Sequence, residues 1–78
     1  MNTVELVENL AKALVDRPEK VVVRELKGQN TLVIELSVAK EDVGKIIGKK
    51  GRNAEALRTL LGAVAAKERK NFVLEILD

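Results

Sequence analysis

The sequence predicts an α+β fold in the element order α-β-β-α-α-β, in which helices cover one face of a three-stranded mixed sheet. Apolar residues recur at helical spacing near the N-terminus and again after position 52, which indicates two amphipathic helices. Other segments alternate apolar and polar residues, as half-buried strands do. The single proline and several glycines mark where elements end. With 78 residues, the chain is expected to form one domain that spans residues 1–78.

The first helix is expected to begin near Asn2 and to end before Pro18. Asn2 and Glu5 have the spacing of a capping box, which satisfies backbone amides at a helix start. The residue before a proline is pushed toward extended conformations, so Arg17 cannot continue the helix. The residues expected to face the core are Val4, Val7, Leu10, Ala11 and Leu14.

A β-hairpin is expected to follow this helix. The segment 21–27 is rich in β-branched residues and predicts a strand, and Gly28 begins a turn of glycine, glutamine and asparagine. The segment 31–38 alternates apolar and polar residues and predicts the second strand. Its predicted inward residues are Leu32, Ile34, Leu36 and Val38.

Two helices are predicted next, because the apolar period lengthens. The short first one contains Ile46 and Ile47, and it begins with Glu41 and Asp42, which a helix dipole favours in the first turn. Gly48 is expected to end it as a C-terminal cap. The longer second one starts near residue 52, and its predicted inward residues are Ala54, Leu57, Leu60, Leu61 and Val64.

Gly62 lies inside the longer helix, where glycine costs about 1 kcal/mol relative to alanine. We interpret this glycine as a site of close packing, and we expect Arg58 to pair with Glu55 one turn earlier. The segment 71–78 then alternates again and predicts the last strand. A crossover of two helices suits a parallel pairing between this strand and the strand at 31–38.

The sheet face away from the helices is expected to carry a set of apolar side chains, namely Val21, Val23, Val33, Val73 and Leu77. This is more apolar surface than a solvated face needs, and it indicates a partner subunit. In the alternative interpretation, some of these side chains pack beneath the N-terminal helix.

The most informative motif joins the two predicted helices and reads Ile46-Ile47-Gly48-Lys49-Lys50-Gly51-Arg52. Glycines leave the backbone bare, so another chain can approach it closely. The lysines and the arginine indicate that the approaching group is anionic, and backbone amides at a helix start bind phosphate well. The expected ligand is the sugar-phosphate chain of a nucleic acid. One of the two isoleucines is expected in the core and the other on an apolar surface against which bases lie, unless both are core residues.

The charge distribution places this motif in a positive field, although the net charge is only +2. Residues 1–43 carry 6 basic and 8 acidic side chains, whereas residues 44–78 carry 8 basic and 4 acidic ones. No acid lies between Val43 and Ala54. A phosphate chain is therefore expected to be attracted to the glycine loop.

Composition excludes several function classes. Cysteine and histidine are absent, so thiolate and imidazole metal ligands and the usual general base are missing, and neither an enzyme nor a cofactor is expected. The sequence shows no signal peptide and no bilayer-spanning apolar run, so we expect a cytoplasmic protein without a membrane partner or small-molecule substrate. Phe72 is the only aromatic residue, so base stacking is mostly missing and sequence preference should be loose.

The glycine loop has three other interpretations. Taken alone, it is compatible with a helix C-cap followed by a solvated lysine turn. The phosphate-binding loop of an NTPase requires a different glycine–lysine spacing and a Lys-Ser/Thr pair, which this sequence lacks. A helix-hairpin-helix DNA-binding module also binds phosphate with a glycine turn, but such a module is all-helical. The alternating segments at 31–38 and 72–77 oppose it.

A family resemblance lies in residues 46–61, which read IIGKKGRNAEALRTLL. This run is similar to the signature of the small bacterial single-KH RNA-binding proteins of the KhpA type. The resemblance covers essentially the whole chain and implies a type II KH domain, whose GxxG loop clamps four backbone nucleotides of single-stranded RNA. Ala54 departs from the larger aliphatic residue of many KH domains, although small bacterial members commonly carry alanine there.

The resemblance implies a post-transcriptional regulator or RNA chaperone with low sequence specificity. It also implies a homodimer, or a heterodimer with a larger KH-containing protein; in the alternative function, this pairing is primary and RNA binding is secondary. A second basic rim is expected across the groove from the loop, although the same cations would equally complement a helix C-terminus. The predicted RNA-binding residues are Ile46, Ile47, Gly48, Lys49, Lys50, Gly51 and Arg52, with Lys67, Arg69 and Lys70 in the rim.

Overall fold

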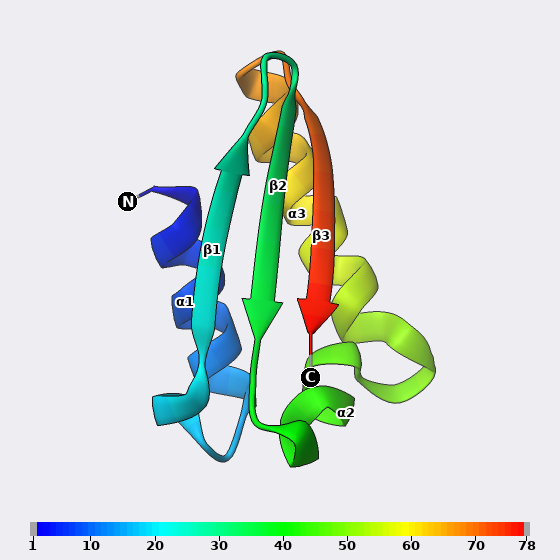
Figure 1. Ribbon diagram of the computed structural model, residues 1–78. Coiled ribbons are helices and arrows are strands. Elements are labelled where there is room, and N and C mark those ends of the chain that lie inside the picture. The colour runs from blue at the N-terminus through cyan, green and yellow to red at the C-terminus, as the bar shows by residue number, and fades with distance from the viewer. Residues whose placement is uncertain (1, 78) are drawn as a thin grey trace.

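The computed structural model describes residues 2–77 and shows a three-stranded sheet with helices packed on one of its faces (Figure 1). The predicted α+β class and the order α-β-β-α-α-β are confirmed. The strands are β1 (Val22–Lys27), β2 (Thr31–Ser37) and β3 (Asn71–Leu77). The helices are α1 (Thr3–Leu14), α2 (Val43–Ile47) and α3 (Arg52–Lys67), and 3-10 turns lie at η1 (Pro18–Lys20), η2 (Lys40–Asp42) and η3 (Lys49–Gly51).

The central strand is β2, and its two neighbours run in opposite directions. β1 pairs with β2 antiparallel through the hairpin turn, whereas β3 pairs with β2 parallel. The crossover through α2 and α3 joins the parallel pair, as the sequence predicted. Because β2 has a neighbour on each side, its inward residues Leu32, Ile34 and Leu36 are almost completely buried.

The start and the end of α1 follow from local sequence. The Asn2 side chain accepts a hydrogen bond from the Glu5 N–H at 2.8 Å, so the predicted cap is confirmed. Leu14 is 38 % exposed, and the prediction that it faces the core is wrong. The helix ends at Leu14, and the extended residue Val15 takes the inward place instead.

α3 packs on the sheet through a narrow row of side chains, which are Ala54, Leu57, Leu61 and Ala65. Leu60 was predicted to face inward but is 52 % exposed, because it lies about 100° around the helix from the buried Leu61. Close packing does not explain Gly62: a Cβ built there would meet no described side chain or other element within 4 Å. Within residues 2–77, no helix combines the length and apolar character needed to cross a bilayer.

The sheet face away from the helices is partly apolar, but β1 contributes other residues than those predicted. Val23 pairs with Leu36 and therefore lies on the core side, and Val21 is buried just before the strand begins. The prediction that both lie on the open face is wrong, because the alternation of β1 is shifted by one residue from the predicted one. Both residues belong to the core. Val33 lies on the open face as predicted, and the exposed apolar residues there are Val22, Leu26, Val73 and Leu77.

Asp42 is the buried charged residue of the described chain, with an exposed fraction of 1 %. Its carboxylate accepts backbone hydrogen bonds from Asp16 at 3.3 Å and from Arg17 at 3.0 Å. Within residues 2–77 it makes no capping bond to α2, but Glu41 and Asp42 lie in the 3-10 turn η2 that leads directly into α2, so the expected acids are present at the helix start. The carboxylate ties the link between α1 and β1 to the start of α2.

Replacement of Gly62 by alanine should stabilise the protein by about 1 kcal/mol, because alanine has the higher helix propensity and its Cβ displaces nothing. Urea unfolding followed by circular dichroism would measure the change in the free energy of unfolding. Ala63→Gly, at an exposed position of the same helix, is the reverse control and should lose a similar amount. A destabilised Gly62→Ala protein would contradict this account of the position.

Candidate nucleic-acid interface

The GxxG loop connects α2 to α3 and consists of Gly48, Lys49, Lys50 and Gly51. Gly48 ends α2 by donating its N–H to the Gly44 carbonyl at 2.8 Å, so the predicted C-cap is confirmed. The Gly51 N–H then donates to the Gly48 carbonyl at 3.0 Å and closes a single 3-10 turn. α3 begins at the next residue, so the loop leads directly into a helix start.

Three of the four loop residues have positive φ. Gly48 has φ 77° and ψ 172°, a region that is essentially restricted to glycine. Gly51 has φ 73° and ψ 13°, and Lys50 has φ 57° and ψ 26°, so both are left-handed. For the lysine this conformation costs about 1 kcal/mol. Such strain persists only where the surrounding structure enforces it, and it is common in binding loops.

The two glycines of the loop have different surroundings. A Cβ built on Gly48 would lie 2.6 Å from Cγ of Asn53, so that side chain fills the space beside this glycine. A Cβ built on Gly51 would meet no described atom within 4 Å. Gly51 is therefore the glycine whose bare backbone is open to an approaching ligand.

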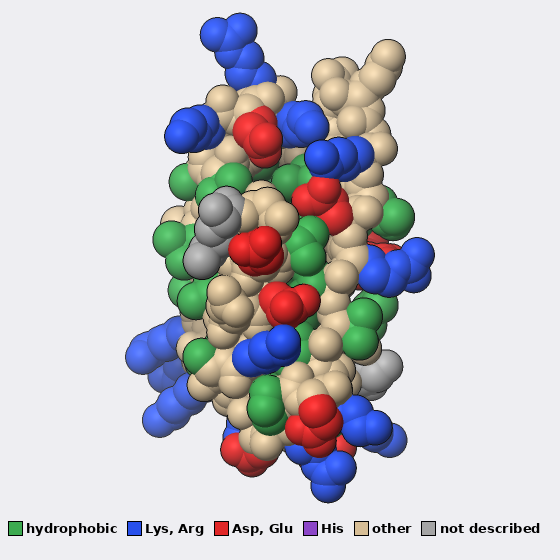
Figure 2. Space-filling model, turned by 90° about the vertical axis from the view of Figure 1, so that its left-hand side faces the viewer, with side chains coloured by type: hydrophobic (Ala, Val, Ile, Leu, Met, Phe, Trp, Pro, Cys, Tyr) green, Lys and Arg blue, Asp and Glu red, His purple; other side chains and the backbone are tan. Residues whose placement is uncertain are grey.

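The cations of the loop are exposed and separate from acids. Lys49, Lys50 and Arg52 are exposed, and none of them forms an ion pair with any residue in the range 2–77. By contrast, acidic and basic side chains are intermixed on the face that carries α1 and the β1 edge (Figure 2). The first turn of α3 also has no side-chain cap from the described residues. Backbone donors and cations thus lie together at a helix start, as a phosphate site requires.

The two isoleucines before the loop divide as the sequence predicted. Ile46 is fully buried in the core, whereas Ile47, the last residue of α2, is 40 % exposed. The alternative that both are core residues is wrong. An apolar surface therefore adjoins the loop at Ile47.

A groove of about 530 Å³ runs between α3 and β3. β3 is an edge strand, so the backbone N–H and C=O groups that do not face β2 are unpaired by the sheet. Arg58 and Gly62 lie one turn apart on the helix side of the groove. The strand side is lined by Lys70, Asn71, Phe72, Val73 and Leu74.

Arg58 belongs to this groove, a role that was not predicted. Within residues 2–77 it forms no ion pair, so the expected pairing with Glu55 is absent. A sequence signal was present nonetheless. Arg58 and Gly62 are four residues apart, which puts a cation and a position without a side chain on the same helix face.

The second basic rim lies at the far end of α3 from the loop, not across the groove from it. α3 has 16 residues and therefore spans about 24 Å between the loop and Lys67. Lys70 lines the groove beside α3, and Arg69, with φ 58°, marks the tight turn into β3. Lys67 also occupies the last turn of α3, where its charge complements the helix dipole, as the second interpretation of this cation states.

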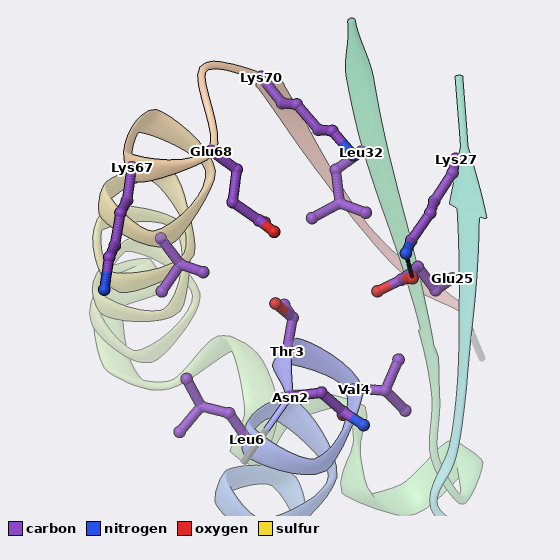
Figure 3. Close-up of a pocket in the computed structure, with 11 residues that line it drawn as sticks. Asn2, Thr3, Val4, Leu6, Glu25, Lys27, Leu32, Lys67, Glu68 and Lys70 are labelled. Atoms are coloured by element: carbon purple, nitrogen blue, oxygen red, sulfur yellow. Dashed lines mark ion pairs between the residues drawn. The ribbon is translucent and has the colours of Figure 1, made fainter. Parts of the chain in front are cut away.

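A larger hollow, of about 580 Å³, lies between the start of α1, the end of α3 and the β1–β2 hairpin (Figure 3). Its charges are mixed: Glu25 and Lys27 form an ion pair at 3.4 Å, and Glu68 points into the space (Figure 3). A carboxylate in this place opposes a polyanion. The loop and the groove along α3, whose described lining residues include no acid, are therefore the candidate nucleic-acid interface.

Comparison with known proteins identifies the family of the chain. The family model described as the KH domain of KhpA and KhpB matches residues 4–76. The chain belongs to this family. The fold and the family predicted from residues 46–61 are thereby confirmed, and the family consists of RNA-binding proteins without enzymatic activity, as expected.

Curated relatives match over nearly the whole chain. The RNA-binding protein KhpA of Caldanaerobacter subterraneus is 55 % identical over 73 residues, which are 94 % of this chain and 97 % of the relative. The protein of the same name from Clostridium perfringens is 53 % identical over 73 residues, with the same two coverages. That of Borreliella burgdorferi is 49 % identical over 77 residues, 99 % of this chain and 94 % of the relative.

A solved structure of similar fold is that of Era in complex with MgGDPNP and nucleotides 1506–1542 of 16S ribosomal RNA. The match has a TM-score of 0.56 and a sequence identity of 26 %. It covers 94 % of this chain but 28 % of the Era chain, so the likeness concerns one part of that larger protein.

The different surroundings of the two glycines predict different mutational costs. Gly51→Ala should destabilise the protein by about 1 kcal/mol, the cost of a left-handed residue with a Cβ. Gly48→Ala should cost about 3 kcal/mol or more, because its conformation is more restricted and its Cβ would overlap Asn53. Urea unfolding of both variants would measure this. Equal costs would contradict the assignment of Gly48 to internal packing.

Proposed function

We propose that the protein binds single-stranded RNA through the GxxG loop, with the sugar-phosphate chain against Gly51 and the first turn of α3. The observation that supports this most is an open glycine set among the exposed cations Lys49, Lys50 and Arg52. RNA is favoured as the nucleic acid because the curated relatives are named RNA-binding proteins, and because the similar Era structure contains ribosomal RNA.

In this proposal, phosphate oxygens accept hydrogen bonds from backbone amides of the loop and of the first turn of α3. The positive end of the helix dipole and the three loop cations favour the anion. Since Gly51 carries no side chain, the phosphate chain can lie directly against the peptide groups. Neighbouring bases then lie against Ile47 and along the groove, where Arg58 supplies a further cation.

The far rim extends this interface to longer RNA. From the loop, α3 leads past Arg58 and Gly62, which line the groove, to Lys67 in its last turn. Lys70 lines the groove as well, and Arg69 precedes it. The helix spans about 24 Å, which takes the RNA past the four nucleotides that a GxxG loop clamps. In this proposal the rim therefore contacts nucleotides outside the site of the loop itself.

Sequence preference should be low, because the interface offers phosphate contacts and little base stacking. Stacking on an aromatic ring stabilises each base by about 1–3 kcal/mol, but the chain has one aromatic residue, the half-buried Phe72. Phosphate contacts position a strand without reading its sequence. We therefore assign the protein to post-transcriptional control or RNA chaperone activity in the cytoplasm, where many RNAs have to be bound loosely.

Affinity for an unstructured oligoribonucleotide of about four nucleotides, which fills the site of the loop alone, should fall with salt as expected for about two or three phosphate contacts. The slope of log affinity against log salt should then be about −1.4 to −2.1. Fluorescence anisotropy at several KCl concentrations would measure the slope. Lys49→Asp combined with Lys50→Asp should weaken binding by at least about tenfold and flatten the slope, because the lost contacts no longer release counterions.

The matched control is Lys12→Asp combined with Lys20→Asp, which changes the net charge equally but lies on α1 and η1. It should change affinity much less, because neither lysine lies in the loop or lines the groove. In an NMR titration, RNA should shift the amide resonances of Gly48 to Arg52. Resonances that stay unmoved there while others shift would falsify the proposal.

A second function, pairing with another KH-containing chain, is favoured by the open face of the sheet. Two cross-strand rows on this face carry its exposed apolar residues, which are Val22, Leu26, Val73 and Leu77. A charged row lies between them: Arg24 and Glu35 form an ion pair at 3.6 Å, and Glu75 is the neighbour of Glu35 on β3. Like charges on neighbouring strands repel, so Glu75 would gain from a cation supplied by a partner.

A second copy placed face to face, with its two-fold axis along β2, would supply that cation. Such an axis lays β1 of one copy over β3 of the other, so Arg24 faces Glu75 across the interface. The same operation places Leu26 over Val73, and the second apolar row is matched in the same way. We propose that this face pairs either two copies of the chain or one copy with a larger KH-containing protein.

Val22→Glu combined with Leu26→Glu should abolish this pairing in sedimentation velocity, whereas Leu60→Glu, exposed on α3, should leave it intact. Arg24→Glu or Glu75→Arg alone should weaken the dimer by about tenfold, and the double swap should restore it. The monomeric variant should bind RNA at the loop with unchanged affinity. A wild-type chain that stays monomeric at all concentrations would contradict the homodimer.

A further inference from the structure

α2 depends on contacts outside itself. Its five residues are too few for a helix that is stable in isolation. Ile46 anchors it in the core, and the chain then leaves through Gly48 in a conformation that is nearly restricted to glycine. The direction in which the GxxG loop is presented is thus set at the C-terminal end of α2.

Lys45, near that end, is held from two directions. Its ammonium lies 3.1 Å from the carboxylate of Asp16 and 3.8 Å from that of Asp42. The hydrogen bond to Asp16 raises the pKa of Lys45 above its ordinary value. Its carbonyl accepts a hydrogen bond from Nδ2 of Asn53 at 2.9 Å. The side chain therefore ties α2 to the segment after α1, and the carbonyl ties it to α3.

The Asn53 side chain spans the GxxG loop from α3 back to α2. The Lys45 carbonyl that it reaches is one of those that a helix leaves unpaired at its C-terminal end. On the way, it lies against Gly48: a Cβ on this glycine would be 2.6 Å from Cγ and 2.8 Å from Nδ2 of Asn53. The close approach of these two residues requires glycine at position 48.

We propose that Asn53 is the positioning residue of the GxxG loop, whose amide fixes the end of α2 against the start of α3 and thereby presents Gly51 to phosphate. The proposal rests on the proposed RNA-binding function and deepens it. Asn53 acts through Gly48 and Lys45, on the packed side of the loop, whereas the open side belongs to Gly51. The two glycines of the motif thus have separate roles, one toward the protein and one toward the RNA.

Asn53→Leu tests this proposal, because leucine keeps the shape of asparagine but cannot donate to the Lys45 carbonyl. The matched control is Thr59→Ala, which removes a side-chain bond to the Glu55 carbonyl at 3.0 Å within α3 and has no tie to α2. Two quantities are measured on each folded variant. They are amide hydrogen exchange of the free protein at residues 48–51 and affinity for an unstructured oligoribonucleotide.

In Asn53→Leu, loop exchange should be about tenfold faster and RNA affinity about tenfold weaker, with the salt slope unchanged, since the lost bond is internal and the phosphate contacts remain. Thr59→Ala should stay within about twofold of wild type in both quantities. Unchanged loop exchange would overturn the positioning role. Faster exchange with unchanged affinity would overturn its connection to RNA.

Failure of the proposed function is distinguishable from failure of this inference. If RNA leaves the loop amides of the wild type unmoved, RNA binding at the loop is wrong, while exchange in the free protein still decides whether Asn53 holds the loop. If Asn53→Leu does not fold, hydrogen exchange of the wild-type protein tests whether the Asn53 side chain is held. Its Asn53 side-chain amide protons should exchange about tenfold more slowly than those of Asn30, an exposed turn residue. Equal exchange would overturn the proposal.

Discussion

The parallel pairing of β2 and β3 is the constraint on which the rest of the structure depends. Parallel neighbours cannot be joined by a tight turn, so the chain has to cross over one face of the sheet. The crossover consists of α2, the GxxG loop and α3. Because α3 returns along the whole length of the strands, its two ends carry the loop and the basic rim about 24 Å apart. The groove between α3 and β3 is the direct result of this connection.

The backbone of the loop is strained, and contacts of the flanking residues hold it in this conformation. Three residues with positive φ turn the backbone within a single 3-10 turn, and one of them is a lysine. This arrangement persists because the buried Ile46 fixes α2, Asp42 ties its start to the rest of the chain, and Asn53 joins its end to α3. A bare peptide surface for phosphate therefore rests on polar contacts made on the opposite side of the loop, away from any ligand.

The two surfaces proposed for RNA and for a second protein chain lie on different sides of the domain. The proposed RNA interface lies at the loop and along the outer side of α3 and β3, whereas the open face of the sheet lies on the side opposite the helices (Figure 1). Residue Val73 shows how closely they adjoin, because it is exposed on the open face and also lines the groove. Pairing through the sheet would leave the loop itself free, so a dimer would present two loops to one RNA.

The sequence by itself determined the order of the elements and the location of the loop, because these depend on neighbouring residues. The Asn2 cap, the stop at Gly48 and the cluster of cations without acids are all local, and each could be predicted without coordinates. The family signature in residues 46–61 is local as well. Alternation likewise predicted β2, since a strand with two neighbours has one strongly buried side.

The tertiary structure decided what depends on residues far apart in the chain. Which side of β1 faces the core was set by its register against β2, and this moved Val23 inward. Leu60 is exposed because the contact between α3 and the sheet is narrow. The separate roles of Gly48 and Gly51 depend on where the Asn53 side chain lies, and the place of Arg58 in the groove depends on β3. Local patterns specify the elements, but only packing between elements specifies which residues are buried and which neighbours they contact.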